Sequence, residues 1–158
     1  MLVCILNEIM SKKKKRILII RCGLLGDTID STAVVKPLVD HYGDELEIDW
    51  VTKPNLEKLF QYDTRIKPII IRFTKLPLLL NFDKLKIIFK SLLNPYDAVI
   101  NLEVGKKFIS LAKYTKSKTK VGLPNKYIPE NIKNEHRAHH QLRILQSAYK
   151  GIDIQNSY

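Results

Sequence analysis

Short apolar runs alternate with amphipathic segments along most of the chain. The apolar runs predict five β-strands, at residues 17–21, 46–51, 67–73, 97–102 and 120–123. Helical spacing of apolar residues predicts helices between and after them, at residues 28–42, 54–62, 82–93, 106–116 and 138–149. Strands that alternate with helices are typical of a parallel sheet with helices on both faces. With right-handed crossovers, the pattern predicts a Rossmann-like α/β domain.

Two residues are expected to shape the first helix, at residues 28–42. Pro37 lies inside it and is expected to kink it, because proline lacks the amide hydrogen and its ring crowds the preceding turn. Gly43 follows directly and is a natural residue for ending a helix. The helix at 82–93 places four apolar residues on one face: Leu85, Ile88, Phe89 and Leu92.

The most informative segment runs from Arg16 to Thr28 and reads Arg-Ile-Leu-Ile-Ile-Arg-Cys-Gly-Leu-Leu-Gly-Asp-Thr. A buried strand is followed by a turn with Gly23 and Gly26, which allow a sharp bend and the close approach of a ligand. Asp27 is expected to cap a helix that begins at Thr28. Because ligands of open α/β sheets bind at the carboxyl ends of the strands, this turn is a candidate ligand site.

The same turn also fits a purely structural interpretation. Asp27 would then be only a helix cap, and Gly23 and Gly26 only turn residues. The segment contains neither Gly-x-Gly-x-x-Gly nor Gly-Lys-Thr/Ser, so it is neither a dinucleotide fingerprint nor a P-loop. The turn therefore predicts a ligand site without naming the ligand.

The net charge of the chain limits the classes of partner that we expect it to bind. The 158 residues suffice for one domain with a core, and their formal net charge of +11 favours anionic partners: a phosphorylated ligand, an anionic membrane surface or nucleic acid. The basic segment Ser11–Arg16 is either a solvated tail or a patch for an anionic leaflet. Lys106 and Lys107 follow the end of a predicted strand, which makes them the better candidates for contacting phosphate within a lysine-rich region. Two cysteines indicate a reducing compartment and no disulfide scaffold.

Several segments resemble glycosyltransferase family 9, the ADP-heptose:lipopolysaccharide heptosyltransferases. The turn from Arg21 to Ile29 is similar to the N-terminal signature of that family. The likeness continues in register over about residues 16–151, through three further segments: Glu47–Val51, Tyr96–Leu102 and Thr119–Leu123. One departure is Asn101, which stands where the family often has an acid. The resemblance implies the two-domain GT-B fold, of which this sequence would be the acceptor-side N-terminal half.

The resemblance also implies a chemistry. Family members transfer a sugar from a nucleotide sugar with inversion, without metal or cofactor, so ADP-heptose is a candidate donor here. Asp27 would be the general base that takes the proton from the acceptor hydroxyl. Arg21 would either pair with Asp27 or meet a ligand phosphate. The residues implied in substrate binding are Arg21, Gly23, Gly26, Thr28, Lys106 and Lys107, and backbone amides of Gly23–Thr28 could orient an anionic group.

The implied setting is the cytoplasmic face of the inner membrane, where the protein would be peripheral. Its partners would be a phosphorylated glycolipid acceptor of the lipopolysaccharide core or a related glycan, the anionic membrane surface and a separate donor-binding half. Without that half we expect a truncated or half enzyme that is inactive alone: a gene fragment, one half of a split enzyme or a free acceptor-binding domain. The expected organisation is a basic tail at 1–15, the acceptor-side domain at 16–151 and a second tail at 152–158.

An alternative from another class remains. The chain could be a non-enzymatic basic domain that binds an anionic membrane surface or nucleic acid. Nucleic acid is disfavoured because few aromatic residues are interleaved with the lysines. This alternative predicts salt-sensitive binding to any polyanion, whereas the transferase predicts selective binding of a phosphorylated sugar-lipid.

Overall fold

The computed structural model describes residues 14–103, 105–123 and 136–149. Within them, five parallel strands form one sheet in the order β3-β2-β1-β4-β5. The strands are β1 (Lys15–Ile20), β2 (Leu46–Thr52), β3 (Ile66–Ile70), β4 (Tyr96–Asn101) and β5 (Ser117–Val121). Lys15 and Arg16 belong to β1 and not to a tail. Lys14 precedes β1 and is exposed, whereas residues 1–13 of the predicted basic tail and the C-terminal tail at 152–158 lie outside the described residues.

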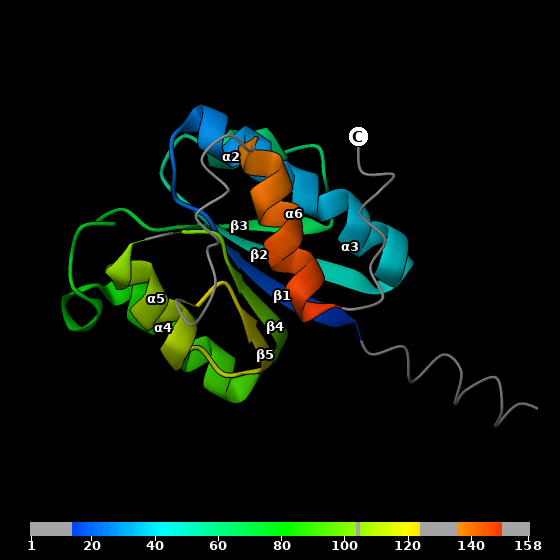
Figure 1. Cartoon of the computed structure of the whole chain (residues 1–158). Coiled ribbons are helices and arrows are strands. Elements are labelled where there is room, and N and C mark those ends of the chain that lie inside the picture. Colours follow the sequence, from blue (N-terminus) through cyan, green and yellow to red (C-terminus); the bar gives the residue numbers. More distant parts are fainter. Residues whose placement is uncertain (1–13, 104, 124–135, 150–158) are drawn as a thin grey trace, which may run out of the picture.

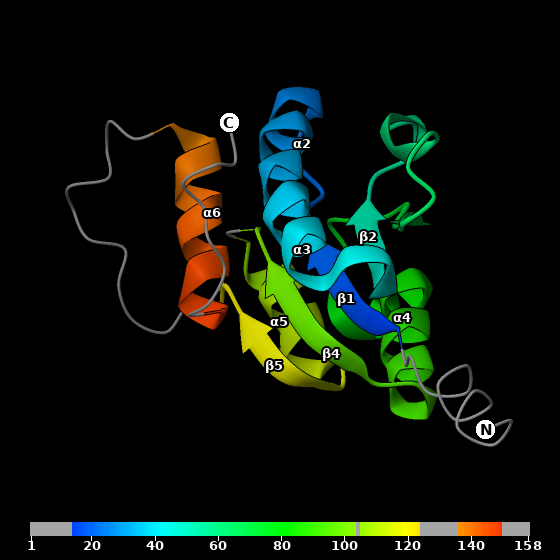
Figure 2. The same cartoon turned by 90° about the vertical axis from the view of Figure 1, so that its right-hand side faces the viewer.

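Helices cover both faces of this sheet (Figure 1). The α-helices are α2 (Leu25–Ser31), α3 (Val35–Tyr42), α4 (Phe82–Leu93), α5 (Lys106–Tyr114) and α6 (Arg137–Ala148). Figures 1 and 2 show α4 and α5 on one face, and α2, α3 and α6 side by side on the other. The predicted Rossmann-like architecture is therefore confirmed.

The central strand β1 explains why its sequence is a continuous apolar run. Ile17 and Ile19 pack in the cluster that includes α3 and α6, whereas Leu18 and Ile20 pack in the cluster that includes α4 and α5. All four side chains are at most 1% exposed. A strand buried on both faces has no polar side, so the alternation of apolar and polar residues disappears.

The predicted helix at 28–42 is interrupted. The chain forms α2, then one turn of 3₁₀-helix, η1 (Thr32–Val34), and then α3. The interruption lies one turn before Pro37, which lacks the amide hydrogen that would reach Ala33 and whose ring crowds that carbonyl. A second short 3₁₀-helix, η2 (Gly43–Glu45), follows α3, and Gly43 there has φ +58°. The sequence predicts a kink at Pro37, and the structure instead has a short stretch of 3₁₀-helix one turn before it.

Other predicted elements differ in form. Residues 54–62 make turns and the short 3₁₀-helix η3 (Glu57–Phe60) instead of an α-helix, since Asn55 has φ +73° and breaks the helical path. The strand predicted at 67–73 ends at Ile70, and another 3₁₀-helix, η4 (Leu78–Leu80), precedes α4. Pro68 fits within β3 because this strand lies at the edge of the sheet.

The orientation of α4 also departs from its apolar pattern. Two of the four apolar residues that share a face, Phe89 and Leu92, are exposed. The side chains buried beneath the helix are instead those of Lys84, Ile87 and Ser91. Polar contacts hold this orientation: Ser91 Oγ accepts a hydrogen bond from the backbone of Lys116, next to β5.

Candidate functional site

Asp27 lies in the first turn of α2, just after the loop that follows β1, and it is not the N-cap residue. The helix begins at Leu25, so Asp27 is its third residue. Its Oδ2 accepts a hydrogen bond from the backbone N–H of Leu24 at 3.1 Å. Leu24 has no side-chain acceptor, so only this half of a capping box forms. The carboxylate is thus folded back over the turn that follows β1.

The guanidinium of Arg21 forms an ion pair with this carboxylate. Its Nη2 lies 3.4 Å from Asp27 Oδ1. Its Nη1 donates to the carbonyl of Leu102 at 2.8 Å, which ties the guanidinium to the end of β4. Of the two roles considered for Arg21, pairing with Asp27 is the one this arrangement contains. A ligand phosphate at Arg21 would have to compete with that pair.

A second carboxylate joins the cluster, and it belongs to no motif in the sequence. Glu103 follows β4, the neighbour of β1 in the sheet. Its Oε1 accepts from the backbone N–H of Cys22 at 2.6 Å and lies 3.9 Å from Arg21 Nη1. Its only sequence signal is an acid two residues beyond a strand, which the parallel order brings to the same sheet edge as Asp27.

The two glycines of the turn play different parts. A Cβ atom on Gly23 would lie 2.6 Å from Asp27 Cβ and 3.0 Å from its Oδ2, so a larger residue must displace the carboxylate. A Cβ on Gly26 would meet nothing within 4 Å. The fold therefore requires glycine at position 23, whereas at Gly26 it merely leaves open space.

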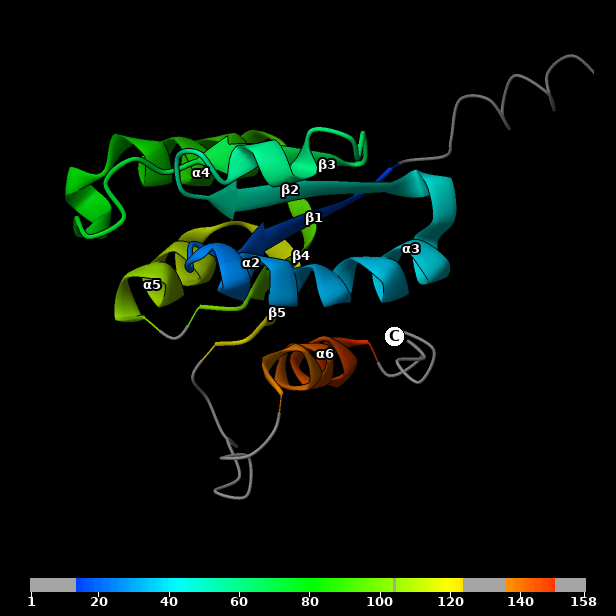
Figure 3. The ribbon, with the colours of Figure 1, turned by 90° about the horizontal axis from the view of Figure 1, so that it is seen from above.

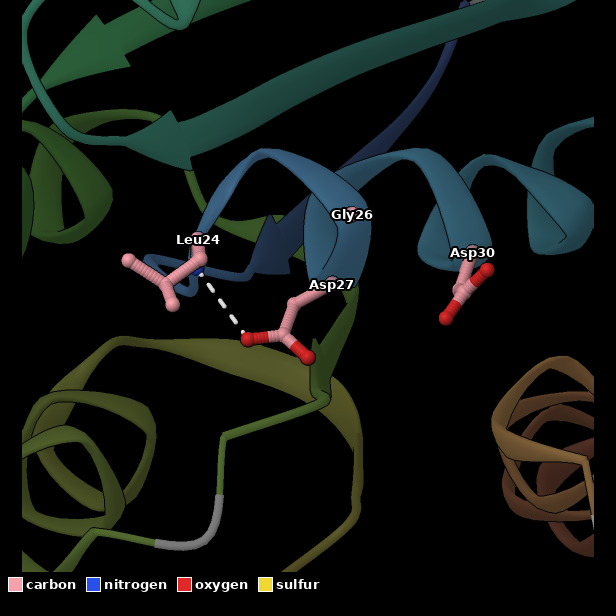
Figure 4. A pocket seen from close by; sticks show the side chains of 4 residues that line it. All are labelled: Leu24, Gly26, Asp27 and Asp30. Carbon is pink, nitrogen blue, oxygen red and sulfur yellow. Dashed lines mark hydrogen bonds between the residues drawn. The ribbon is translucent and has the colours of Figure 1, made fainter.

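That open space is part of a shallow hollow of about 300 Å³. Four residues line it: Leu24, Gly26, Asp27 and Asp30. Figure 4 shows the carboxylates of Asp27 and Asp30 projecting from the same side of α2. The Asp27 side chain is 18% exposed, so it is held by the chain and still reaches solvent.

Thr28 does not reach this hollow. It is fully buried, and its hydroxyl donates to the carbonyl of Leu24 at 3.0 Å. Its backbone N–H bonds the same carbonyl at 2.9 Å. The substrate contact implied for Thr28 is therefore not available in this arrangement, because the residue packs inside the turn. The backbone amides of Cys22 and Leu24 are likewise occupied by carboxylates of the chain.

Lys106 and Lys107 lie at the start of α5, after β4. Both are exposed, and neither is among the residues that line the hollow. The Lys107 ammonium donates to the carbonyl of Lys75, in the segment that follows β3. The structure thus groups Arg21, Gly23, Gly26 and Asp27 in one site, adds Glu103 to it, and leaves the two lysines outside the hollow.

The fold is similar to that of solved heptosyltransferase and family 9 glycosyl transferase structures. E. coli heptosyltransferase WaaC with ADP matches with a TM-score of 0.68 and 13% identity, over 89% of this chain and 49% of that chain. A family 9 glycosyl transferase from Veillonella parvula matches with a TM-score of 0.70 and 19% identity, over 94% and 44%. WaaC with ADP-2-deoxy-2-fluoro heptose gives 0.67 and 14%, over 89% and 50%.

The likeness lies in the fold. The chain spans about half the length of the structures that it matches. No protein-family model matches the sequence, and no curated protein matches it at a significant level. In the part of the chain that the structure describes, no helix has the length and apolar character needed to cross a bilayer.

Proposed function

We propose that this chain is the acceptor-side half of a family 9-type glycosyltransferase. It would transfer a sugar from a nucleotide sugar to a glycan acceptor of the lipopolysaccharide core or a related surface glycan. The observation that carries the proposal is the Asp27 carboxylate, positioned by Arg21 and the Leu24 amide and partly exposed in a hollow. Its place after the first strand of a heptosyltransferase-like fold supports this role.

In the proposed reaction Asp27 accepts the proton of the acceptor hydroxyl. The hydroxyl oxygen then bonds to the anomeric carbon of the donor, and the bond from that carbon to the nucleotide diphosphate breaks with inversion. Arg21 and the Leu24 amide are donors, so they hold the carboxylate and stabilise its charge. A positioned general base contributes about 10²–10⁴-fold to the rate. No metal and no cofactor enters the proposal.

Donor binding would require a second half. The matched structures are about twice as long as this chain, and those of WaaC contain ADP or an ADP-heptose analogue. We therefore propose a nucleotide sugar, with ADP-heptose as the candidate, bound by a donor-binding half. The acceptor would be a phosphorylated glycolipid with Lys106 near its phosphates, and the protein would work at the cytoplasmic face of the inner membrane.

The test replaces the base without removing its structural contact. In Asp27→Asn the side-chain oxygen can still accept from Leu24, and Arg21 keeps its bond to the Leu102 carbonyl, so the fold should persist. The full chain is co-expressed with the donor-binding half of a family 9 enzyme, and sugar transfer is measured. We expect Asp27→Asn to lower turnover at least about 100-fold in a protein that still folds. Its melting temperature should fall somewhat, because the amide nitrogen replaces the oxygen that pairs with Arg21.

Asp30→Asn is the matched control, because it makes the same change one turn along α2 in the same hollow. It should keep turnover within a few-fold of the wild type. Unchanged turnover in Asp27→Asn would remove the assigned base. Equal binding of the isolated chain to heparin and to a phosphorylated core oligosaccharide, both abolished by salt, would favour the non-enzymatic alternative.

A further inference from the structure

The outer face of α4 is apolar. Phe82, Phe89 and Leu93 are 87%, 64% and 90% exposed. Their spacing of seven and four residues places them on one stripe along the helix. Leu92, beside them, is also exposed. A helix on the surface of a globular protein normally turns its apolar stripe toward the core. In α4 Ile87 and Ile88 face the core, and the helix carries this second apolar stripe outward.

Buried polar contacts also fix the orientation of α4. The fully buried Lys84 extends its ammonium to the carbonyls of Thr74 and Leu76, at 3.1 and 3.0 Å. Asn81, also buried, caps α4 by accepting from the Lys84 amide at 3.1 Å and donates to the Phe73 carbonyl at 2.6 Å. Lys84 and Asn81 thus point inward and bond backbone groups of this segment.

The segment before α4 extends the apolar surface. Phe73, Leu79 and Leu80 are all exposed, and Lys84 and Asn81 hold the backbone that carries them. Together with the stripe on α4 they form what we call the α4 patch, made of Phe73, Leu79, Leu80, Phe82, Phe89 and Leu93. Figure 3 shows α4 beside β3 at the margin of the molecule, on the side away from α6.

A basic groove runs next to this patch, between β3 and α4. Arg72, Lys86 and Lys90 line it, together with the acid Asp83, whose carboxylate accepts from the Arg72 amide. Its volume is about 370 Å³. Residues 72–94 contain one acidic residue against five basic ones, a formal charge of +4: Asp83 against Arg72, Lys75, Lys84, Lys86 and Lys90.

From these observations we infer that the α4 patch docks the protein on an anionic lipid bilayer. The phenyl and leucyl side chains enter the interface, while Arg72, Lys86 and Lys90 meet lipid phosphates. An amphipathic helix with an apolar stripe and adjacent lysines binds anionic membranes in this way, through buried apolar area and attraction to the headgroups. This inference assigns the membrane association in the proposed function to a particular surface of the protein. It does not depend on the role of Asp27.

Charge favours a bilayer over a second copy of the chain as the occupant. A symmetric dimer presents the same patch twice, so it would bring two basic grooves together. Like charges brought together at an interface disfavour association, whereas an anionic leaflet neutralises them.

The test is co-sedimentation of the full chain with vesicles of phosphatidylcholine alone or mixed with phosphatidylglycerol. We expect binding only to the mixture. Phe89→Gln/Leu93→Gln should weaken the partition at least about tenfold, because two exposed apolar side chains no longer enter the interface. Lys86→Gln/Lys90→Gln should weaken it about 30-fold, from about 1 kcal/mol per charge.

Matched controls make the same changes elsewhere. Tyr62→Gln removes an exposed aromatic side chain in the connection between β2 and β3. Lys36→Gln/Lys58→Gln removes two positive charges from exposed positions outside α4. Both should bind vesicles within about twofold of the wild type. Because every variant keeps the basic segment before β1, binding that survives the patch variants would assign docking to that segment and overturn the inference.

Insertion itself can be read from fluorescence. Phe89→Trp should shift its emission to the blue on mixed vesicles, whereas Tyr62→Trp should not, and the buried Trp50 contributes a constant background. The absence of a shift in Phe89→Trp would overturn membrane docking. A dimer in light scattering that dissociates in the patch variants would also overturn it. Transfer to a water-soluble acceptor should survive Phe89→Gln/Leu93→Gln, so failure of docking and failure of the proposed chemistry remain distinguishable.

Discussion

At the scale of single residues, Gly23 decides where Asp27 lies. A methyl group at position 23 would come within 2.6 Å of Asp27 Cβ, so Gly23→Ala must push the carboxylate away from Leu24 and Arg21. Overpacking of this kind costs about 1–3 kcal/mol. We expect Gly23→Ala to lower the free energy of unfolding by that amount in urea titrations and to reduce transfer in the reconstituted enzyme.

Gly26→Ala is the matched control for this substitution. Among the described residues no atom outside the adjacent chain lies within 4 Å of its methyl group, and alanine favours the helix by up to about 1 kcal/mol, so stability should stay equal or rise. The methyl group enters the hollow, so weaker acceptor binding in a more stable protein would mark the hollow as the ligand site. Equal stability of Gly23→Ala and the wild type would contradict the packing at Asp27.

Cys22 offers a pH test of the same turn. Burial, with the charge of Glu103 as a smaller cause, raises the pKa of its thiol from the ordinary 9.0 to about 12. The thiolate fraction at pH 8 therefore falls about 1,000-fold, and alkylation of native Cys22 should slow at least as much relative to unfolded protein. Mass spectrometry of a Cys4→Ser background measures it, since that leaves Cys22 alone to react.

The sign of the linked effect on stability follows from the raised pKa. Below pH 9 both the folded and the unfolded chain keep the proton, so Cys22 adds no pH dependence. Between pH 9 and about 12 the unfolded state releases the proton first, so the free energy of unfolding falls as pH rises. Rapid alkylation in the native state would show that the thiol is accessible and the turn is open.

The sequence predicted part of this site because part of it is local. Arg21, Gly23, Gly26 and Asp27 lie within seven positions, and a strand followed by a glycine turn and an acid is a recognisable pattern. Glu103 contacts Cys22 across 81 positions. That contact depends on β4 lying beside β1, which no local pattern encodes. Thr28 was misplaced because its orientation depends on the helix beginning at Leu25, three residues earlier than expected.

At the scale of elements, periodicity found the helices but not always the face that they bury. The presence of the strands follows from apolar runs most clearly in β1, β2 and β4, which are buried on both faces of the sheet. Their order within the sheet does not follow from these runs. In α4 apolar residues occur around most of the helix, so spacing alone cannot choose the inward side. The buried contacts of Lys84 and Ser91 choose it, and they join segments that are distant in the sequence.

At the scale of the whole molecule, the two ends of the sheet differ in character. The carboxyl end carries the Asp27 turn and its partly exposed carboxylates. The amino end is closed by a nearly buried ion pair, in which Arg16 Nη2 lies 3.1 Å from Asp49 Oδ2. The hydroxyl of Tyr96 donates a hydrogen bond to the same oxygen at 2.6 Å. Burial raises the pKa of Tyr96 well above its usual value, and this hydrogen bond raises it further. These three side chains join β1, β2 and β4.

This junction should carry much of the stability, because removing one member leaves a buried charge. The Asp49 side chain is 4% exposed, and without Arg16 it keeps only the Tyr96 hydroxyl among these contacts. Arg16→Met should therefore cost about 3–5 kcal/mol in urea unfolding. Lys36→Met is the control, because its pair with Asp40 is exposed and worth less than about 1 kcal/mol.

Adding Asp49→Asn to Arg16→Met should recover part of the lost stability, because the amide removes the unpaired charge and still accepts from Tyr96. If Arg16→Met alone lowered the free energy of unfolding by less than about 1 kcal/mol, water would have to reach Asp49 at the amino end of the sheet. The same variants should leave acceptor binding at the opposite end within a few-fold of the wild type. Substitutions at the amino end of the sheet would then change stability without changing function, because the residues proposed to contact substrate lie at the carboxyl end.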